Sequence, residues 1–62
     1  MTFLTRDELL ALSSTRLAAH YRTTLAWVRA RPSHEQWRHG EYLGLVQRAF
    51  FVALDAERSV TP

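Results

Sequence analysis

The chain has 62 residues, a net charge of +2 and no cysteine. A chain of this length holds one small domain with one core, and ordering it costs about 1.5 kcal/mol of entropy per residue, which leaves little net stability. Without cysteine, neither disulfides nor a thiolate metal site can add to that stability. We therefore expect residues 1–62 to form a single domain that gains stability from self-association or from a partner protein.

Hydropathy along the chain argues against a secretory leader and against a membrane span. The start, MTFLTRDELLAL, places Asp7 and Glu8 inside what would be the apolar region of a leader, and no small-residue cleavage site follows. The longest apolar stretch lies between Arg48 and Asp55, far short of the roughly 20 apolar residues that a span needs. We expect a soluble, cytoplasmic protein that has no membrane as a partner.

The front of the chain predicts a short helix over about residues 5–12. Thr5 and Glu8 have the spacing of a capping box, in which each side chain accepts a hydrogen bond from the other residue's backbone N–H. Ser13 and Ser14 then offer either a break with a new N-cap or two tolerated polar positions. The first turns therefore form either a separate short helix or an extension of the next one.

A second helix is predicted over about residues 14–30, because apolar residues recur there at spacings of three, four or seven and form one stripe. The stripe consists of Leu10, Leu17, Ala18, Tyr21, Leu25 and Val28. The opposite side is small and almost uncharged, with Ala19, Thr23, Ala26 and Ala30. This smooth side reflects either the high helix propensity of alanine or a surface that another helix approaches closely. Pro32 ends the helix, since the residue before a proline is pushed out of the α region.

A third helix is predicted over about residues 33–58. Ser33 has the position of an N-cap, and Gln36 three residues later completes a box-like signature. Gly40 either belongs to this helix or ends a short first turn, in which case the main helix begins at Glu41. The connection between the second and third helices is short, so these helices should be antiparallel neighbours.

One broad apolar side of the third helix is centred on Val46. Its members are Tyr42, Leu43, Val46, Ala49, Phe50, Ala53 and Leu54. This side matches the stripe around Tyr21 on the second helix, and together they would form the core. The sequence thus predicts an all-α fold, an antiparallel helical hairpin with a short extra N-terminal helix or helical extension.

The third helix has more apolar surface than this hairpin can cover. Phe50 and Phe51 are adjacent and project about 100° apart on a helix, so they cannot face the same neighbour. The residues left uncovered are Trp37, Gly44 and Phe51, spaced by seven on the side away from Val46, and Leu45 and Val52 on the flank. We predict that these five residues form a protein interface, with the aromatic residues as anchors and Gly44 allowing close approach.

Catalytic and metal-binding patterns are missing. His34, Glu35 and His39 resemble the zinc-protease motif H-E-x-x-H, but these histidines are five residues apart, about 140° around a helix, and do not share the face that one zinc ion needs. The chain has no G-x-S-x-G elbow and no glycine-rich phosphate loop, and a hairpin this small offers no enclosed pocket. We expect no enzymatic activity, no metal and no cofactor.

The basic residues, all of them arginines, gather in the middle of the chain. Residues 13–31 contain four arginines and no acid. Arg22 and Arg29 lie on one side of the second helix and Arg16 and Arg31 on the other, so they flank the core stripe and do not form a phosphate-binding patch. Nucleic acid is therefore not favoured as the main partner, and a small nucleic-acid-associated regulator is the second alternative function.

The order of these features resembles that of a known family. The start MTFLTRDELL, the arginine-rich helix ending in VRAR, the polar break, the E-Q-W step and the final LVQRAFFVAL resemble the small E-component of the type III secretion needle chaperones, the YscE/PscE/SsaE type. The resemblance covers nearly the whole chain. It implies a cytoplasmic co-chaperone that binds and stabilises a helical-repeat partner chaperone, and through that partner keeps a needle subunit monomeric until export. No interface residue is carried over from the family.

Two classes of function would therefore explain the uncovered apolar surface. The leading hypothesis is the co-chaperone, which acts by burying apolar surface against another helical protein. The first alternative is a self-assembling structural or regulatory helical protein, a homo-oligomer when alone, in which a second copy buries the same surface. The oligomeric state of the isolated chain discriminates between them.

Overall fold

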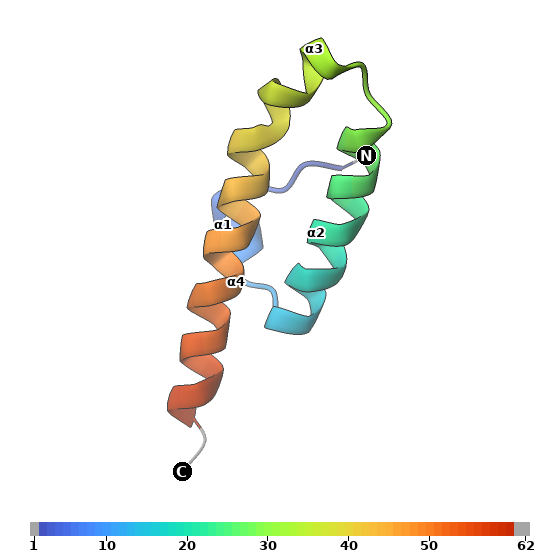
Figure 1. The fold of residues 1–62 in the computed structure, drawn as a ribbon. Coiled ribbons are helices and arrows are strands. Elements are labelled where there is room, and N and C mark those ends of the chain that lie inside the picture. Colours follow the sequence, from blue (N-terminus) through green and yellow to red (C-terminus); the bar gives the residue numbers. More distant parts are fainter. Residues whose placement is uncertain (1, 61–62) are drawn as a thin grey trace.

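A computed structural model describes residues 2–60 of the chain, and at residue 60 the backbone only. Its elements in chain order are α1 (Arg6–Leu10), α2 (Ser14–Arg29), α3 (Ser33–Gln36), the 3-10 turn η1 (Trp37–His39) and α4 (Gly40–Val60). Helices α2 and α4 lie side by side and antiparallel, and α1 lies behind α4 (Figure 1). The predicted fold class is confirmed, an all-α helical hairpin with an N-terminal helical extension.

Two side-chain caps define the front of the chain. The Thr5 backbone N–H donates to Glu8 Oε1 at 3.0 Å, and the Glu8 N–H donates to Thr5 Oγ1 at 3.2 Å, which is the expected capping box. The hydrogen bond from the Thr5 backbone, and then that with its hydroxyl, hold the pKa of Glu8 below its ordinary value of 4.5. Ser13 Oγ accepts from the Arg16 N–H at 3.3 Å and caps α2, so the chain breaks at Ser13 and α1 is a separate helix.

The break also determines which leucine of the front segment is buried. The predicted stripe of the second helix contained Leu10, but Leu10 is 47% exposed and belongs to α1. Leu9 is fully buried in its place. That part of the prediction is wrong because helical periodicity carries a side-chain direction along one continuous helix only, and the turn before Ser13 resets it.

The hydrophobic core lies where α1, α2 and α4 meet. Its buried members are Leu9, Leu17, Val46 and Ala49. Partly buried residues packed against them are Leu4, Leu12, Tyr21, Tyr42, Phe50 and Ala53. Val46, the centre of the predicted apolar side, is fully buried, whereas on α2 the fully buried residues are Leu17 and Thr24 and not Tyr21. Each large side chain buried in this way contributes about 1.5–3 kcal/mol to folding.

Aromatic rings and one hydroxyl attach the segment before α1 to the hairpin. The Leu4 backbone N–H donates to Tyr42 Oη at 2.8 Å, and the same oxygen lies 2.7 Å from His20 Nε2. The Phe3 ring packs edge-on against Tyr42, with ring centroids 4.8 Å apart, and stacks on His39 at 5.7 Å. The N-terminal segment is therefore held by contacts from both long helices.

At the other end of the hairpin, a carboxylate links α4 to the start of α2. Glu57 Oε2 accepts from the Ser14 backbone N–H at 3.0 Å, and Glu57 Oε1 accepts from the Ser14 hydroxyl at 2.8 Å. Ser14 is the first residue of α2, where a free backbone N–H and the helix dipole both favour a negative charge. The link closes the end of the hairpin that lies away from α3 (Figure 1).

The turn between the long helices differs from the prediction. Pro32, not Ser33, occupies the N-cap position of α3, and no side chain caps that end. Gln36 instead donates from Nε2 to the Arg31 carbonyl at 2.9 Å. It therefore satisfies a backbone carbonyl just after α2 and does not cap the start of the next helix. The single third helix that was expected is α3, η1 and α4 in succession, with the main helix beginning at Gly40.

Candidate protein interface

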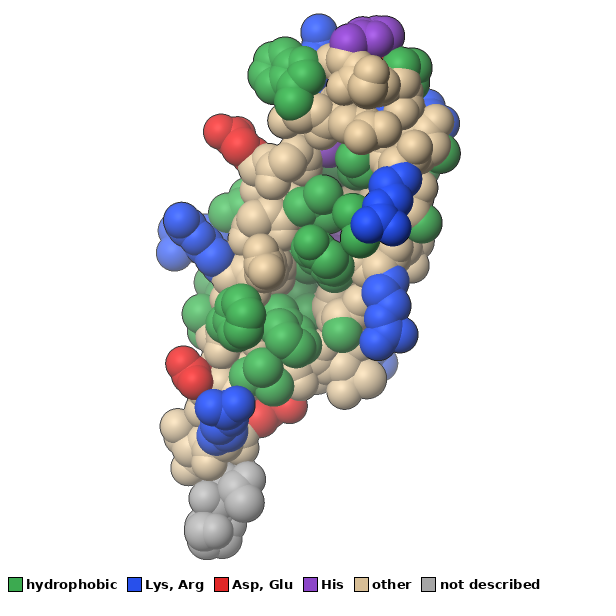
Figure 2. All heavy atoms as spheres, viewed as in Figure 1, with side chains coloured by type: hydrophobic (Ala, Val, Ile, Leu, Met, Phe, Trp, Pro, Cys, Tyr) green, Lys and Arg blue, Asp and Glu red, His purple; other side chains and the backbone are tan. Residues whose placement is uncertain are grey.

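The face of the hairpin that α1 does not cover has a hollow between α2 and α4. One part, of about 230 Å³, is lined by Ala18, Tyr21, Arg22, Gln47, Phe50 and Phe51. A second part, of about 370 Å³, is also lined by Ala18, Arg22 and Phe50 and extends to Ser14 and Leu54. The shared residues make the two parts one continuous trough, which we call the open groove. Apolar side chains gather along it in Figure 2.

The two adjacent phenylalanines divide between the inside and the lip of the open groove. Phe50 is partly buried and packs against the core cluster, and Phe51 is 55% exposed. Their ring centroids are 5.7 Å apart with the planes inclined at 66°, an edge-on arrangement. Phe50 therefore supports Phe51 from inside, and Phe51 presents an aromatic surface that no described residue covers.

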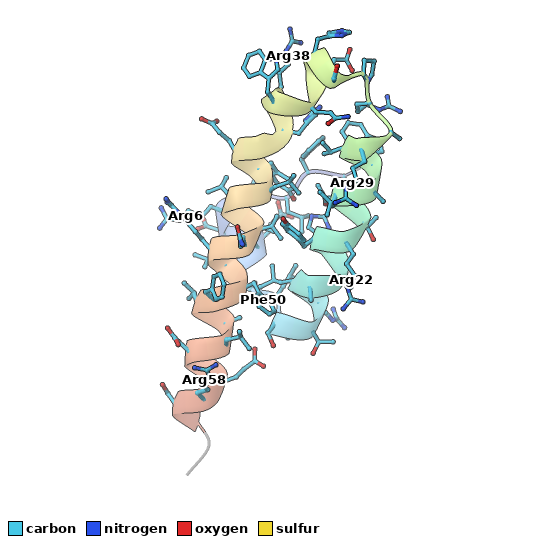
Figure 3. The ribbon with its side chains drawn as sticks, in the orientation of Figure 1. Arg6, Arg22, Arg29, Arg38, Phe50 and Arg58 are labelled. Atoms are coloured by element: carbon cyan, nitrogen blue, oxygen red, sulfur yellow. The ribbon has the colours of Figure 1, made fainter. Side chains whose placement is uncertain are left out.

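The α2 edge of the open groove is basic. Arg22 lines the open groove, and Arg29 projects from the same side of α2 about two turns farther on, beyond the residues that line the groove; both are exposed (Figure 3). Within residues 2–60 no ion pair to either guanidinium is found, and the ion pair that is found joins His34 to Glu35 at 4.0 Å. These two arginines are thus free to bind a carboxylate from outside the chain.

A second apolar surface lies on the other flank of α4. Leu10, Leu45 and Val52 line a groove between α1 and α4, with exposed fractions of 47%, 42% and 55%. Arg6 and Arg48 stand at its edges. We call this surface the α1–α4 groove. It arises because α1 has only five residues and leaves the flank of α4 beyond it uncovered.

The five residues predicted as an interface do not form one surface. Phe51 lies on the open groove, whereas Leu45 and Val52 lie on the α1–α4 groove. Trp37 is 73% exposed at the end of the hairpin, where the Arg38 guanidinium lies 5.8 Å from its ring centroid. The remaining member, a glycine, lies next to Leu45, and a Cβ added to Gly44 would meet no atom of the chain within 4 Å. Their role in binding stays a prediction.

Sequence reasoning missed the walls of the open groove. Tyr21, Phe50 and Leu54 were assigned to the core because they lie on the sides of the two helices that face each other. The signal that could have placed them was their position at the margin of each apolar face, next to Arg22 on one helix and Gln47 on the other. Residues at such margins line a groove when no third helix covers them.

The three histidines lie apart in different surroundings. His20 contacts the Tyr42 hydroxyl, and His39 packs against the Trp27 ring with centroids 4.9 Å apart. His34 is near Glu35 on the surface of α3. Among residues 2–60 no three histidine, aspartate or glutamate side chains come together in a way that could hold a metal ion.

Trp27 marks the other side of α2, away from the open groove. Its ring contacts Phe3 edge-on, with centroids 5.7 Å apart, and the Arg31 guanidinium lies 4.9 Å from its centroid. Arg31 therefore has an aromatic partner, whereas among the described residues no such contact is found for Arg22 or Arg29.

Within the described part of the chain, no helix is both long enough and apolar enough to cross a membrane. Comparison with protein-family models, with curated proteins and with solved structures finds no match for this chain.

Proposed function

We propose that this chain is a non-enzymatic binding protein that docks on a helical partner protein and stabilises it. The proposal is carried by one observation, that Phe51 stands 55% exposed at the lip of an apolar groove which no helix within residues 2–60 covers. Large exposed aromatic side chains beside a hollow are typical anchors of protein interfaces.

The same proposal in its finer form makes the chain a cytoplasmic co-chaperone of type III secretion. In that role it holds a helical-repeat partner chaperone, and the pair keeps a needle subunit monomeric. The order of sequence features, from MTFLTRDELL to LVQRAFFVAL, supports this form through its resemblance to the small E-component of needle chaperones.

The mechanism would be burial of apolar surface without chemistry. Covering a large side chain completely contributes about 1.5–3 kcal/mol, and a few such anchors supply most of the affinity of a typical interface. The open groove offers Phe51 and the edge of Phe50, and the α1–α4 groove offers Leu45 and Val52. A partner with several helices, such as a helical-repeat protein, can cover both surfaces.

Photo-crosslinking in the native host tests the proposal. A benzophenone amino acid in place of Phe51 should crosslink to a helical-repeat protein, and a needle subunit should co-purify if the finer form holds. Ala26 is the matched control, because it is exposed on the smooth side of α2 and lines neither groove. Crosslinks from both positions alike, or to no helical protein, would contradict the proposal.

Self-assembly is the second candidate, and one observation favours it. The chain has apolar grooves on two flanks of α4, so one copy can present either groove to another. Size-exclusion chromatography with light scattering decides the matter: a dimer or tetramer whose mass does not change on dilution supports self-assembly. A monomer, or weak association that dilution reverses, supports a separate partner.

A further inference from the structure

The chemistry of the open groove specifies what kind of helix it can hold. We infer that its occupant is an amphipathic α-helix with acidic side chains along one edge, placed against Arg22 and Arg29. The inference rests on the proposed function, since it names the chemistry of the partner that the open groove binds.

The shape of the groove fits a helix. The trough follows α2 from the level of Ser14 to that of Tyr21 and is walled by α4 on its other side. Two parallel ridges with an apolar floor between them are the surface against which a third helix packs, at axis separations of about 8–10 Å. Helix α1 lies behind α4 (Figure 1), so a helix added at the open groove would pack on the side of the hairpin that faces away from α1.

The charge of the groove fits an acidic edge. Arg22 lines the groove, and Arg29 stands seven residues farther along the same side of α2, about 10.5 Å along the helix axis and beyond the residues that line the groove. A docked helix running alongside presents side chains at the same seven-residue repeat, so two carboxylates spaced by seven can meet both guanidinium groups. No Asp or Glu lines either part of the groove, so an incoming carboxylate would meet no negative charge there.

A second copy of this chain is a poorer occupant than an acidic helix. A copy placed groove to groove brings its own Arg22 and Arg29 and, from its groove lining, no carboxylate to pair with them. Nucleic acid is also a poorer occupant, because the floor between the arginines and α4 is apolar, with Tyr21, Phe50 and Phe51, and offers no further cation for a phosphate backbone.

A displayed peptide library tests the inference on the full chain. Every member has the same leucine and alanine face of an 18-residue helix, and the edge positions are randomised among glutamate, glutamine and lysine. Selection on the wild-type chain should enrich glutamate at two edge positions seven residues apart. The double variant R22E/R29E should select lysine at the same positions and bind the glutamate peptide about tenfold more weakly.

The matched control is R16E/R58E, which changes the net charge equally and removes exposed arginines that line neither groove. It should select the same glutamate peptides as the wild type. The inference is overturned if no peptide is selected, if the edge residues selected on the wild type are neutral or basic, or if R16E/R58E changes the selection as much as R22E/R29E does.

Failure of the inference and failure of the proposed function give different results. A helical partner that crosslinks at position 51 but presents a neutral or basic edge to the groove keeps the proposed function and rejects the acidic edge. A glutamate peptide that binds while no partner crosslinks at position 51 supports the chemistry of the groove and rejects the proposed function.

Discussion

The two sides of helix α4 differ in how completely the rest of the chain covers them. On the side facing α1 and the N-terminal segment, Leu9 is fully buried, the Leu4 N–H bonds to the Tyr42 hydroxyl, and aromatic rings pack around Phe3. On the side of the open groove, Phe50 is only partly covered and Phe51 is exposed. The first side contributes a buried leucine and the contacts that hold the N-terminal segment, and the second has apolar area in excess of what folding uses.

This division teaches that stability and binding can be changed separately in a very small domain. Substitutions on the α1 side should lower the free energy of unfolding, because they remove contacts made within the chain. Substitutions at the lip of the open groove should leave the free energy of unfolding nearly unchanged and alter only what the chain binds.

The largest expected effect comes from the Leu9→Ala substitution. Leu9 is the buried residue that α1 contributes to the core, and removing it should cost about 2–5 kcal/mol of unfolding free energy. The Phe51→Ala control should cost only about 1 kcal/mol, because Phe51 is 55% exposed and loses mainly its edge-on contact with Phe50. Urea unfolding followed by circular dichroism measures both. Equal losses would show that the two sides are not separate.

The Tyr42→Phe substitution should have the next largest effect. It removes the hydroxyl that accepts from the Leu4 N–H and contacts His20, which should cost about 1–2 kcal/mol. Tyr21→Phe is the matched control, since within the described residues its hydroxyl has no hydrogen bond and Tyr21 faces the open groove. Hydrogen exchange at the Leu4 amide should speed up in the first variant and not in the second.

The Thr24→Val substitution should stabilise the chain from inside the core. Thr24 Oγ1 is buried and has no hydrogen-bond partner in the part of the chain described here. Replacing the hydroxyl with a methyl group of similar size removes an unsatisfied polar atom and should raise the unfolding free energy by about 1 kcal/mol. The exposed neighbour Thr23, substituted to Val, should give no such gain in the same urea titration.

The Gly44→Ala substitution tests the uncovered side. An added Cβ meets no atom within 4 Å, and alanine favours a helix over glycine by about 0.5–1 kcal/mol, so the isolated chain should become more stable by that amount. If a partner approaches closely at Gly44, its affinity for the variant should fall although the fold is more stable. The same affinity for both chains would remove Gly44 from the predicted interface.

The smallest effect is a pH dependence at the start of α1. Because the folded chain lowers the pKa of Glu8 below 4.5, its contribution to stability is complete above pH 4.5 and is lost as the pH falls further, through the folded pKa. The wild-type chain should therefore lose more stability than Glu8→Gln between about pH 6 and pH 3. Parallel losses in the two chains would show that the capping box does not contribute.

The sequence predicted the features that depend on neighbours within one turn of helix. The Thr5 and Glu8 capping box and the all-α hairpin with its N-terminal extension were predicted from local spacing. The position of Val46 in the core followed from periodicity along a single uninterrupted helix. The placement of Leu10 in the core stripe was wrong because periodicity was carried across the break at Ser13.

The features that were not predicted join residues far apart in the chain. Tyr42 with Leu4, and Glu57 with Ser14, are separated by 38 and 43 residues, and neither pair has a local signature. The candidate site was predicted only in part for the same reason, because it too depends on how distant segments pack. A helical wheel places Phe51 and Leu45 outside the core, and both are exposed. They lie on different grooves because α1 packs along one flank of α4, and its direction cannot be read from a helical wheel.

The link between Glu57 and Ser14 has a consequence for how the chain folds during its synthesis. Helix α2 leaves the ribosome well before the carboxylate that holds its first residue, because 43 residues separate the two. Contacts of such long sequence separation form late and slow folding, since the intervening loop must first close. We therefore expect the chain to acquire its structure in one late step, once residue 57 has emerged, and not helix by helix from the N-terminus.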